Sequence, residues 1–368
     1  MKPTRLFAAA VALLVGGAWA QAQILIGQTV GVTGAVAATV KESMTGAMLY
    51  LDAVNAKGGV AGEKIEIVTL DDKFDTKLAA ANARTLIEER QVLALFMSRG
   101  TPHTEGIIPI LDQHGVPMIG PSTGAMTLHK PLRRHVFNVR ATYQREAEKA
   151  IAHLASQGIT RIAVIHVDDS FGADGLVGAQ KGLTNAKLKP VAVAKFDRTK
   201  PDFSAIVPIM TKADAQAIVI IGSGTAVVDG IKAVKSVSGG TQFVTLSNNA
   251  SGGFIKLLGD HARGVIVSQV LPQTFTYPIV KEATQLARAR DIHDVSPAML
   301  EGFTTAKVLV EALRRSGAKP TRDRLQVALE SLNKFDVGGL EISYSATDHT
   351  GLDFADLSII SADGKFRR

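Results

Sequence analysis

Short apolar runs alternate with longer stretches of helical periodicity along most of this chain. The first series of apolar runs predicts strands at residues 24–27, 65–70, 93–97 and 116–119. Helical stretches follow, most clearly at residues 41–55, which stop at Gly58 and Gly59, and at residues 76–90. Repeated strand and helix units are typical of a parallel sheet with helices on its faces.

A second series of the same kind begins after residue 140. Its predicted strands lie at residues 162–165, 191–194, 217–221 and 243–246. Gly, Ser, Asn or Asp residues follow these runs, as is usual where a strand enters a turn. Two such series predict an α/β protein with two doubly wound, mostly parallel sheets, one in each of two lobes.

The C-terminal part of the chain has a different pattern. It predicts a strand at 264–271, long helices at 296–316 and 321–332, and short strands from residue 340 onward. We expect this part to complete both sheets, with the chain crossing between lobes near Arg140, Leu271 and Gly339. The predicted first lobe comprises residues 23–140 and 272–339, and the predicted second lobe comprises residues 141–271 and 340–368.

Two turns of the first series are candidates for anion binding. The strand at 93–97 runs into Ser98-Arg99-Gly100-Thr101-Pro102, and the strand at 116–119 runs into Gly120-Pro121-Ser122-Thr123-Gly124. Hydroxyls and free backbone N–H groups at a helix N-terminus attract anions. Because adjacent parallel strands end at one edge of a sheet, both turns face the region where open α/β folds bind ligands.

Composition narrows the possible functions. The 368 residues are 46% hydrophobic, enough for two cores, and the absence of cysteine excludes a disulfide framework or a lipidated cysteine. The formal net charge of +7 is scattered along the chain, and only 5% of the residues are aromatic. Nucleic-acid-binding proteins gather basic residues with aromatics into patches, so we do not expect that class here.

The N-terminus has the form of a secretory signal peptide. Lys2 and Arg5 precede an apolar stretch that is short for a membrane span, and Ala18-Trp19-Ala20 has the small-residue pattern of a cleavage site. We expect residues 1–20 to be removed, with cleavage after Ala22 as the alternative. No later stretch predicts a membrane helix, so the expected location is a bacterial periplasm.

Two glycine-containing motifs suggest other chemistries. Gly120-Pro121-Ser122-Thr123-Gly124 matches the G-x-S-x-G pattern of hydrolases, in which His261 or His293 could supply the base. Gly222-Ser223-Gly224 begins like a dinucleotide fingerprint, but Val227 stands where the third glycine belongs. We expect no cofactor, and we keep an exported serine hydrolase as an alternative function.

Charged residues suggest two further kinds of site, one for a metal ion and one for a carboxylate. Asp168 and Asp169 have no further metal-ligating residue in their segment, and the histidines lack ligand spacing, so we expect no metal site. Arg99 lies inside the first anion-binding turn, where a guanidinium can meet a carboxylate with two hydrogen bonds. Arg140 and Tyr143 lie at the first expected crossing and are further candidates, although each could equally have a structural role.

Together, these features resemble the leucine/isoleucine/valine-binding family of type I periplasmic binding proteins. The most specific match is Asn55-Ala56-Lys57-Gly58-Gly59-Val60 followed by Asp71-Asp72. Supporting matches are Gly34, Gly62, Gly115-Val116-Pro117, Gly120-Pro121-Ser122-Thr123 and Phe171-Gly172. The resemblance covers essentially the whole chain after the signal segment. It implies a Venus-flytrap fold with a multi-strand hinge, in a monomer that delivers one small ligand to an inner-membrane ABC permease.

The resemblance also implies where the ligand lies. Thr101 would hold its carboxylate together with the turn Ser122-Thr123-Gly124. From the residues of the first turn we add Arg99 and the amide of Gly100. In the family, aromatic residues cover the ligand at positions that match Phe171 and Phe303, and also Gly224, where this chain has no aromatic. From the turns of the second lobe we add Ser223, Ser247 and Asn248, which would close over the ligand body, and the hydroxyl of Tyr143.

The chain departs from the amino-acid binders at two of these positions. Those proteins meet the ligand ammonium with an acidic residue at the turn that reads Leu246-Ser247-Asn248-Asn249 here, and with a threonine where Gly124 stands. A buried ammonium without its carboxylate would cost several kcal/mol. We therefore expect an aromatic or oxo acid rather than an α-amino acid. A sensor that passes its closed state to a signalling partner is the alternative to a transport function.

Overall fold

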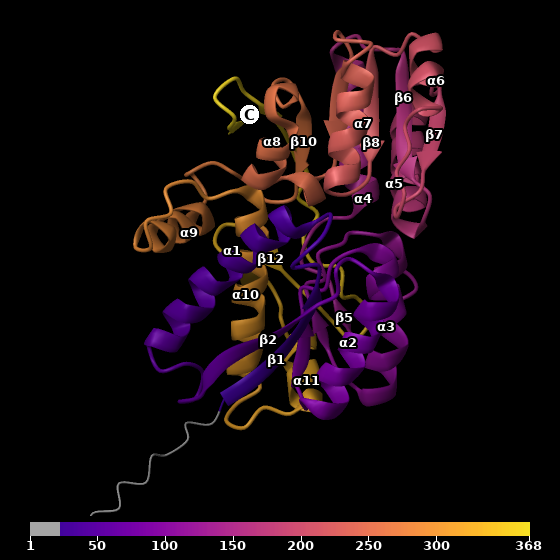
Figure 1. The fold of residues 1–368 in the computed structure, drawn as a ribbon. Helices are drawn as coiled ribbons and strands as arrows, with labels where there is room; N and C mark the ends of the chain where they lie inside the picture. The colour runs from indigo at the N-terminus through magenta and orange to yellow at the C-terminus, as the bar shows by residue number, and fades with distance from the viewer. Residues whose placement is uncertain (1–22) are drawn as a thin grey trace, which may run out of the picture.

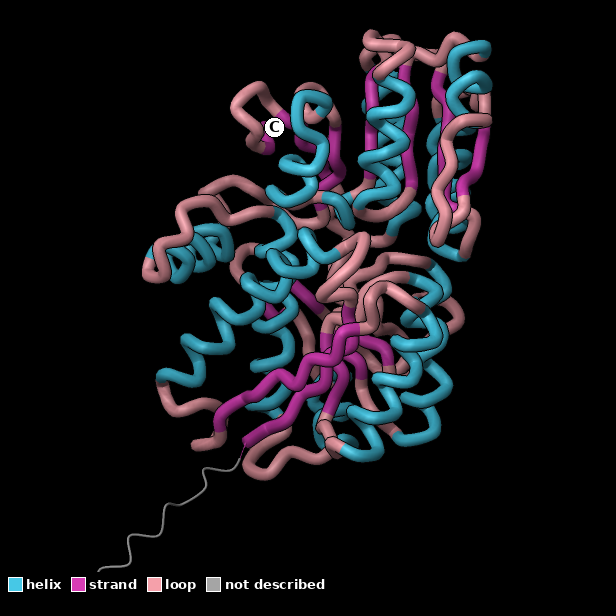
Figure 2. Tube along the Cα trace, viewed as in Figure 1, coloured by secondary structure: helices cyan, strands magenta, loops and turns pink. Residues whose placement is uncertain are grey.

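The computed structural model describes residues 23–368, and the expected signal peptide lies outside them. The described chain forms two α/β bodies (Figures 1 and 2). The first contains a five-stranded sheet of order β2-β1-β3-β4-β5, in which every pairing is parallel. Its strands are β1 (Gln23–Val30), β2 (Lys64–Asp71), β3 (Ala94–Phe96), β4 (Met118–Ile119) and β5 (Val136–Phe137).

The second body contains a seven-stranded sheet of order β14-β13-β10-β9-β8-β6-β7. Strands β6 to β10 pair in parallel, whereas β13 and β14 add an antiparallel edge. The strands are β6 (Ile162–Val167), β7 (Val193–Phe196), β8 (Ala217–Ile221), β9 (Gln242–Thr245), β10 (Ile266–Gln269), β13 (Asp356–Ile360) and β14 (Phe366–Arg367). The predicted fold class, two doubly wound lobes, is confirmed.

Helices cover both sheets. Those of the first body are α1 (Ala37–Ala56), α2 (Thr76–Arg84), α3 (Thr101–His114), α9 (Pro278–Arg288), α10 (Pro297–Arg315) and α11 (Arg322–Glu330). Those of the second are α4 (Tyr143–Ser156), α5 (Ser170–Asn185), α6 (Ile206–Lys212), α7 (Thr225–Lys235) and α8 (Gly252–Leu258). The helix expected at 76–90 ends earlier as an α-helix, because the chain widens into a π-turn, η1 (Thr85–Glu89).

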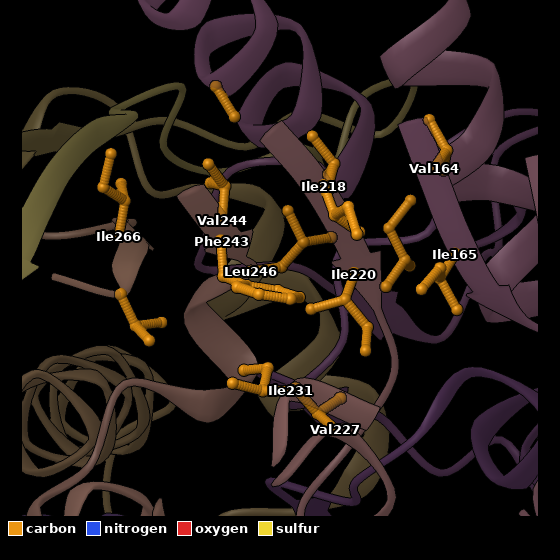
Figure 3. Packing of buried hydrophobic residues seen from close by; sticks show 14 of the residues in the cluster. Val164, Ile165, Ile218, Ile220, Val227, Ile231, Phe243, Val244, Leu246 and Ile266 are labelled. Carbon is orange, nitrogen blue, oxygen red and sulfur yellow. The ribbon is translucent and has the colours of Figure 1, made fainter. Parts of the chain in front are cut away.

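Each body has its own hydrophobic core. Figure 3 shows part of the second core, where Ile218 and Ile220 of β8 lie among Val164, Val244 and neighbouring side chains. Strands β6 and β8 are nearly continuous apolar runs because both faces of a central parallel strand are covered by helices. In the first body, α1 and α10 pack against each other and against the sheet. The core residues of one body are thus separate from those of the other.

The C-terminal segment packs against both bodies in turn. Strands β11 (Phe335–Asp336) and β12 (Glu341–Ile342) form a small antiparallel pair, and Tyr344 and Leu352 lie in the core of the first body. Strand β13 then joins the second sheet. Because residues beyond 340 still belong to the first core, we propose that the last crossing lies between Leu352 and Asp356 rather than near Gly339.

Two general properties bear on function. No helix within residues 23–368 combines the length and apolarity needed to cross a membrane. In the same part of the chain, no three His, Cys, Asp or Glu side chains gather into a group that could hold a metal ion.

Candidate functional site

The two bodies meet at the ends of helices α3 and α7, and both of these helices begin at a glycine. Helices α2, α4, α5, α8, α10 and α11 each have a side-chain N-cap, for example Thr142, whose hydroxyl accepts from the Arg145 amide at 3.2 Å. The N-caps of α3 and α7 are Gly100 and Gly224, with no side chain to satisfy the first amides. The backbone amides in the first turns of α3 and α7 therefore face the junction between the two bodies.

Gly224 brings the two bodies into backbone contact. Its φ is 56°, and a Cβ built on it would lie 1.8 Å from the carbonyl oxygen of Ala35. The Thr225 amide donates to this same oxygen at 3.1 Å. Gly124 is similarly crowded on the first body, where a Cβ would lie 2.5 Å from the carbonyl oxygen of Ala141. Glycine at these positions is thus required by close backbone approach.

The hydroxyls expected to hold a carboxylate bond one another or a carboxylate of the protein. Thr101 Oγ1 and Thr123 Oγ1 are 2.7 Å apart, and both side chains are buried. Ser122 Oγ donates to Glu301 Oε1 of α10 at 2.9 Å. The structure therefore brings Thr101, Ser122 and Thr123 together, as predicted, but it engages their side-chain oxygens in the first body's own hydrogen bonds.

Arg99 crosses the junction. Its side chain is 3% exposed, Nη2 donates to the backbone oxygen of Asn248 at 2.5 Å, and Nη1 donates to Ser122 Oγ at 3.4 Å. Within residues 23–368 both of these partners are neutral oxygens, and no carboxylate forms an ion pair with this guanidinium. Burial lowers the pKa of Arg99, against the smaller opposing influence of Tyr143 and Glu301. The site thus holds a desolvated cation without a contacting counter-charge.

Arg140 lies in the same region but, unlike Arg99, it contacts carboxylates of the protein. Its Nη2 donates to Glu146 Oε1 and, at 2.6 Å, to Ser247 Oγ, while Nη1 is 3.7 Å from Glu301 Oε1. Burial alone would lower the pKa of Arg140, but Glu146 and the other anionic neighbours raise it above its usual value. The guanidinium also lies 4.6 Å from the ring centroid of Tyr143. Arg140 is therefore neutralised within the protein.

Residues of the second body complete the junction. Glu146 Oε2 accepts hydrogen bonds from the Ser247 amide at 2.9 Å and from the Ser268 hydroxyl. Asn248 Nδ2 donates to Ser223 Oγ at 3.0 Å, so Asn248 links the Ser223 turn to Arg99. Phe171 packs against Tyr143, with ring centroids 4.5 Å apart. Residues selected from the sequence therefore contact one another here: Asn248 contacts Ser223, Ser247 contacts Arg140, and Phe171 contacts Tyr143.

Phe303 is placed differently from the expectation. It is fully buried in the core of the first body, where its ring meets Tyr50 of α1 edge-on at 5.3 Å between centroids. Its face of α10 is the one that packs on α1, whereas Glu301, two positions earlier, points to Ser122. The pocket role expected for Phe303 is thus corrected, because helix α10 turns the ring into the core.

Sequence reasoning missed Glu146 and Glu301. Each is a carboxylate on a helix position that is buried, and Glu301 stands in the otherwise apolar or small run Pro297-Ala298-Met299-Leu300 to Phe303. A charge inside an apolar helical stretch was the available signal, because buried charges are almost always paired. The carboxylate beside the Ser247 turn is therefore that of Glu146 in α4, and it is bonded to Arg140 and to the Ser247 amide.

A serine nucleophile needs a hydrogen-bonded histidine base, and Ser122 of the hydrolase motif is bonded to other side chains. The side-chain partners of Ser122 within the described residues are Arg99 and Glu301. His293 is exposed, and His261 is a partly exposed residue of the short 3-10 turn that follows α8. The hydrogen bond from Ser122 to a carboxylate, in place of a histidine base, favours a structural or binding role for this hydroxyl.

Comparison with known proteins gives consistent results over most of the chain. Residues 23–362 match the model of a family described as periplasmic binding protein. The chain is 24% identical over 337 residues to Leu/Ile/Val-binding protein homolog 3 of Brucella melitensis, covering 89% of each protein. It is also 24% identical to the leucine-, isoleucine-, valine-, threonine- and alanine-binding protein of Pseudomonas aeruginosa, covering 85% of this chain and 84% of that one.

Solved structures share the fold. A substrate-binding periplasmic protein from Ralstonia solanacearum is 30% identical with a TM-score of 0.86, over 94% of this chain and 99% of that one. A branched-chain amino acid ABC transporter protein from Thermus thermophilus, solved with bound valine, is 18% identical with a TM-score of 0.81, covering 94% and 95% of the two chains. At this lower identity the likeness concerns the fold alone.

Proposed function

Because the chain belongs to the periplasmic binding protein family, we propose that it is the exported solute receptor of an ABC importer and binds a small, amine-free carboxylate between its lobes. Export rests on the signal-peptide pattern of residues 1–20. The ligand-loaded, closed receptor then docks as a monomer on an inner-membrane permease. Relatives named for leucine, isoleucine and valine support the transporter type, and the ligand class is argued from this chain's own site.

Arg99 is the observation that carries the ligand class. Arg99 is 3% exposed, and within the described chain its guanidinium has only neutral oxygen partners. The free-energy cost of removing this charge from water is therefore not offset by a contacting anion. A carboxylate is the planar partner that a guanidinium fork binds best. The uncapped first turn of α3, with Gly100 and Thr101, adds backbone N–H donors from the same side.

The carboxylates of the site argue against an α-amino acid. An ammonium group needs a buried anion, and the two present are Glu146 and Glu301. Glu146 is bonded to Arg140, the Ser247 amide and the Ser268 hydroxyl, and Glu301 accepts from Ser122 and lies beside Arg140. Binding an ammonium would require breaking one of these groups, which leaves Arg140 undercompensated. An aromatic or oxo acid requires no such rearrangement.

A binding screen tests this function. We expect amine-free acids such as benzoate and 2-oxoisovalerate to raise the melting temperature of the purified protein, because a ligand that binds only the folded state stabilises it. Leucine, valine and the neutral analogue benzamide should leave it unchanged. A screen in which the α-amino acids shift the melting temperature and the amine-free acids do not would refute the ligand class.

Arg99 provides the matched mutational test. We expect Arg99→Gln to weaken binding of the acids by about tenfold or more, since a charge-assisted hydrogen bond contributes roughly 1.5–3 kcal/mol. Arg99→Lys keeps the charge but loses the fork, and should bind with intermediate affinity. Arg90→Gln removes an exposed arginine as the control. Equal affinities of the Arg99→Gln and Arg90→Gln proteins, measured by titration calorimetry, would remove Arg99 from the site.

A further inference from the structure

A cavity lies between the two bodies, and two residues of its lining, Phe74 and Ser223, contact neighbours of Arg99. Its volume is about 130 Å³, and it is lined on the first body by Ala35 and Phe74. The walls from the second body include Phe196, Arg198, Ser223 and Ala226. It lies at the start of helix α7, whose N-cap Gly224 touches Ala35.

The cavity adjoins the neighbours of Arg99 on both bodies. On the first body, Phe74 packs against the residue after Arg99, since a Cβ on Gly100 would lie 3.1 Å from Phe74 Cε2. On the second body, Ser223 accepts a hydrogen bond from Asn248, whose backbone oxygen is bonded to Arg99. A molecule with an anionic end at Arg99 therefore has this cavity next to it.

The walls are suited to a flat apolar group. The ring of Phe74 lies between His103, stacked with centroids 4.4 Å apart, and the guanidinium of Arg198, 4.9 Å from the ring centroid. Arg198 is paired with Asp169 through Nε at 2.6 Å, so it brings no uncompensated charge into the cavity. The remaining lining is mixed: the side chains of Phe196, Val167 and Ala226 are apolar and buried, and those of Thr199, Ser223 and Thr225 are polar.

The backbone that carries Phe74 is strained. Lys73 and Phe74 have φ values of 51° and 62°, in the left-handed region that large side chains rarely adopt. The carboxylate of Asp72 holds the turn by accepting from the Phe74 amide at 2.8 Å. Such strain costs of order 1–3 kcal/mol for each residue and persists mainly where function fixes the geometry.

We propose that this cavity receives the body of the ligand, and that the body is a single ring: the ligand is a monocyclic aromatic carboxylate. The inference rests on the proposed binding of an amine-free acid at Arg99. Size supports it, because a cavity of about 150 Å³ binds benzene, and the cavity here, with its mixed polar and apolar lining, has about 130 Å³. One ring fits, whereas a fused two-ring system exceeds the space. Phe74 and Ala226 then determine which acids bind.

The test fills the cavity from the second body. Ala226→Leu adds a branched side chain at the first turn of α7, where leucine is a good helix former. We expect the variant to bind benzoate at least tenfold more weakly than the wild type and to bind pyruvate, which has no ring, with affinity within twofold. Ala233→Leu, on the same helix but outside the cavity wall, is the control and should bind both acids as the wild type does.

A second variant enlarges the cavity. Phe74→Ala removes one wall, and we expect it to bind 2-naphthoate more tightly than the wild type does while losing affinity for benzoate. The melting temperature of each ligand-free variant shows that it is folded. This variant also separates a wall of the cavity from a merely structural phenylalanine, whose loss would not create affinity for a larger ring.

The possible outcomes separate the two proposals. If pyruvate and other ring-free acids bind through Arg99 but benzoate does not, the proposed function stands and the ring inference is overturned. The same holds if benzoate binds equally well to the wild type and to Ala226→Leu. If the wild type binds none of these acids, the proposed function fails, and the ring inference, which depends on it, fails with it.

Discussion

At the scale of single residues, the junction contains two buried arginines with different electrostatic roles. Arg140 is held by Glu146, with Glu301 nearby, and its pKa is raised by these anions against the effect of burial. Arg99 has neutral oxygen partners, and burial lowers its pKa. Arg140 therefore has its counter-charges within the protein, whereas no carboxylate within residues 23–368 forms an ion pair with Arg99.

Asp72 gives a prediction for pH dependence. Burial raises the pKa of Asp72 to about 6, despite hydrogen bonds from the Phe74 amide and the Thr29 hydroxyl that favour its charged form. A carboxyl with a raised pKa binds its proton more tightly in the folded state than in the unfolded state. Its contribution to the free energy of unfolding is therefore most favourable at low pH and decreases as the pH rises through about 6.

Asp72→Asn should remove this penalty. At pH 8 we expect the variant to be more stable than the wild type by roughly 1–3 kcal/mol, since one pKa unit corresponds to about 1.4 kcal/mol. The difference should shrink as the pH is lowered toward 5. Denaturant unfolding at several pH values measures it, with the exposed Asp229→Asn as the control. A stability difference that does not change with pH would contradict the assignment to Asp72.

At the scale of elements, helices α3 and α7 meet the junction with glycine N-caps, whereas α2, α4, α5, α8, α10 and α11 are capped by Asp, Ser or Thr side chains. A side-chain cap at Gly100 or Gly224 would occupy the amides and the space between the bodies. Gly224 is the more constrained of the two, because its missing Cβ makes room for a backbone oxygen of the other body.

Gly224→Ala should therefore oppose closure. The added Cβ would lie 1.8 Å from the Ala35 oxygen, and the positive φ is itself strained for alanine. We expect ligand affinity to fall by tenfold or more. Gly239→Ala, where a Cβ meets nothing within 4 Å, is the control and should bind normally. Unchanged affinity in Gly224→Ala, measured by calorimetry, would show that closure does not need this contact.

At the scale of the whole molecule, two separate cores are joined by a chain that passes between them repeatedly (Figure 1). The contacts across the junction are polar and local. Examples are the Glu42 carboxylate, which accepts from the Gly252 and Gly253 amides at 3.0 and 2.7 Å, and the hydrogen bond from the Thr225 amide to Ala35. Polar contacts of this kind are readily exchanged for water, so the lobes can separate as rigid bodies.

Closure on ligand binding gives a prediction for shape in solution. We expect the radius of gyration from small-angle X-ray scattering to decrease when a saturating acid is added, because the ligand binds the closed form more tightly than the open one. The Gly224→Ala protein should keep the larger radius at the same acid concentration. An identical radius for the wild type with and without a bound acid would contradict a hinge mechanism.

The sequence by itself determined the repeated strand and helix units, the two-lobe fold and the turns that meet at the junction. These follow from local periodicity and turn chemistry, because burial on one face of a helix or strand is recorded in neighbouring positions. Arg99, Ser122, Ser247 and Asn248 could be selected in this way, since each follows a predicted strand. The meeting of Arg99 and Ser122 needed only that parallel strands end at one edge of the first sheet. Ser247 and Asn248 follow a strand of the second sheet, so their approach to Arg99 was decided by the packing of the two bodies.

The tertiary structure alone decided the electrostatics of the site. Ser122 meets Glu301 across 179 positions of sequence, and Arg99 meets the Asn248 backbone across 149. Phe303 and Glu301 lie two positions apart, yet helix α10 directs one into the core and the other to the junction. Contacts between distant segments determine that, in the part of the chain described, Arg140 is paired with carboxylates and Arg99 is not. A local pattern of apolar and polar residues does not record such contacts.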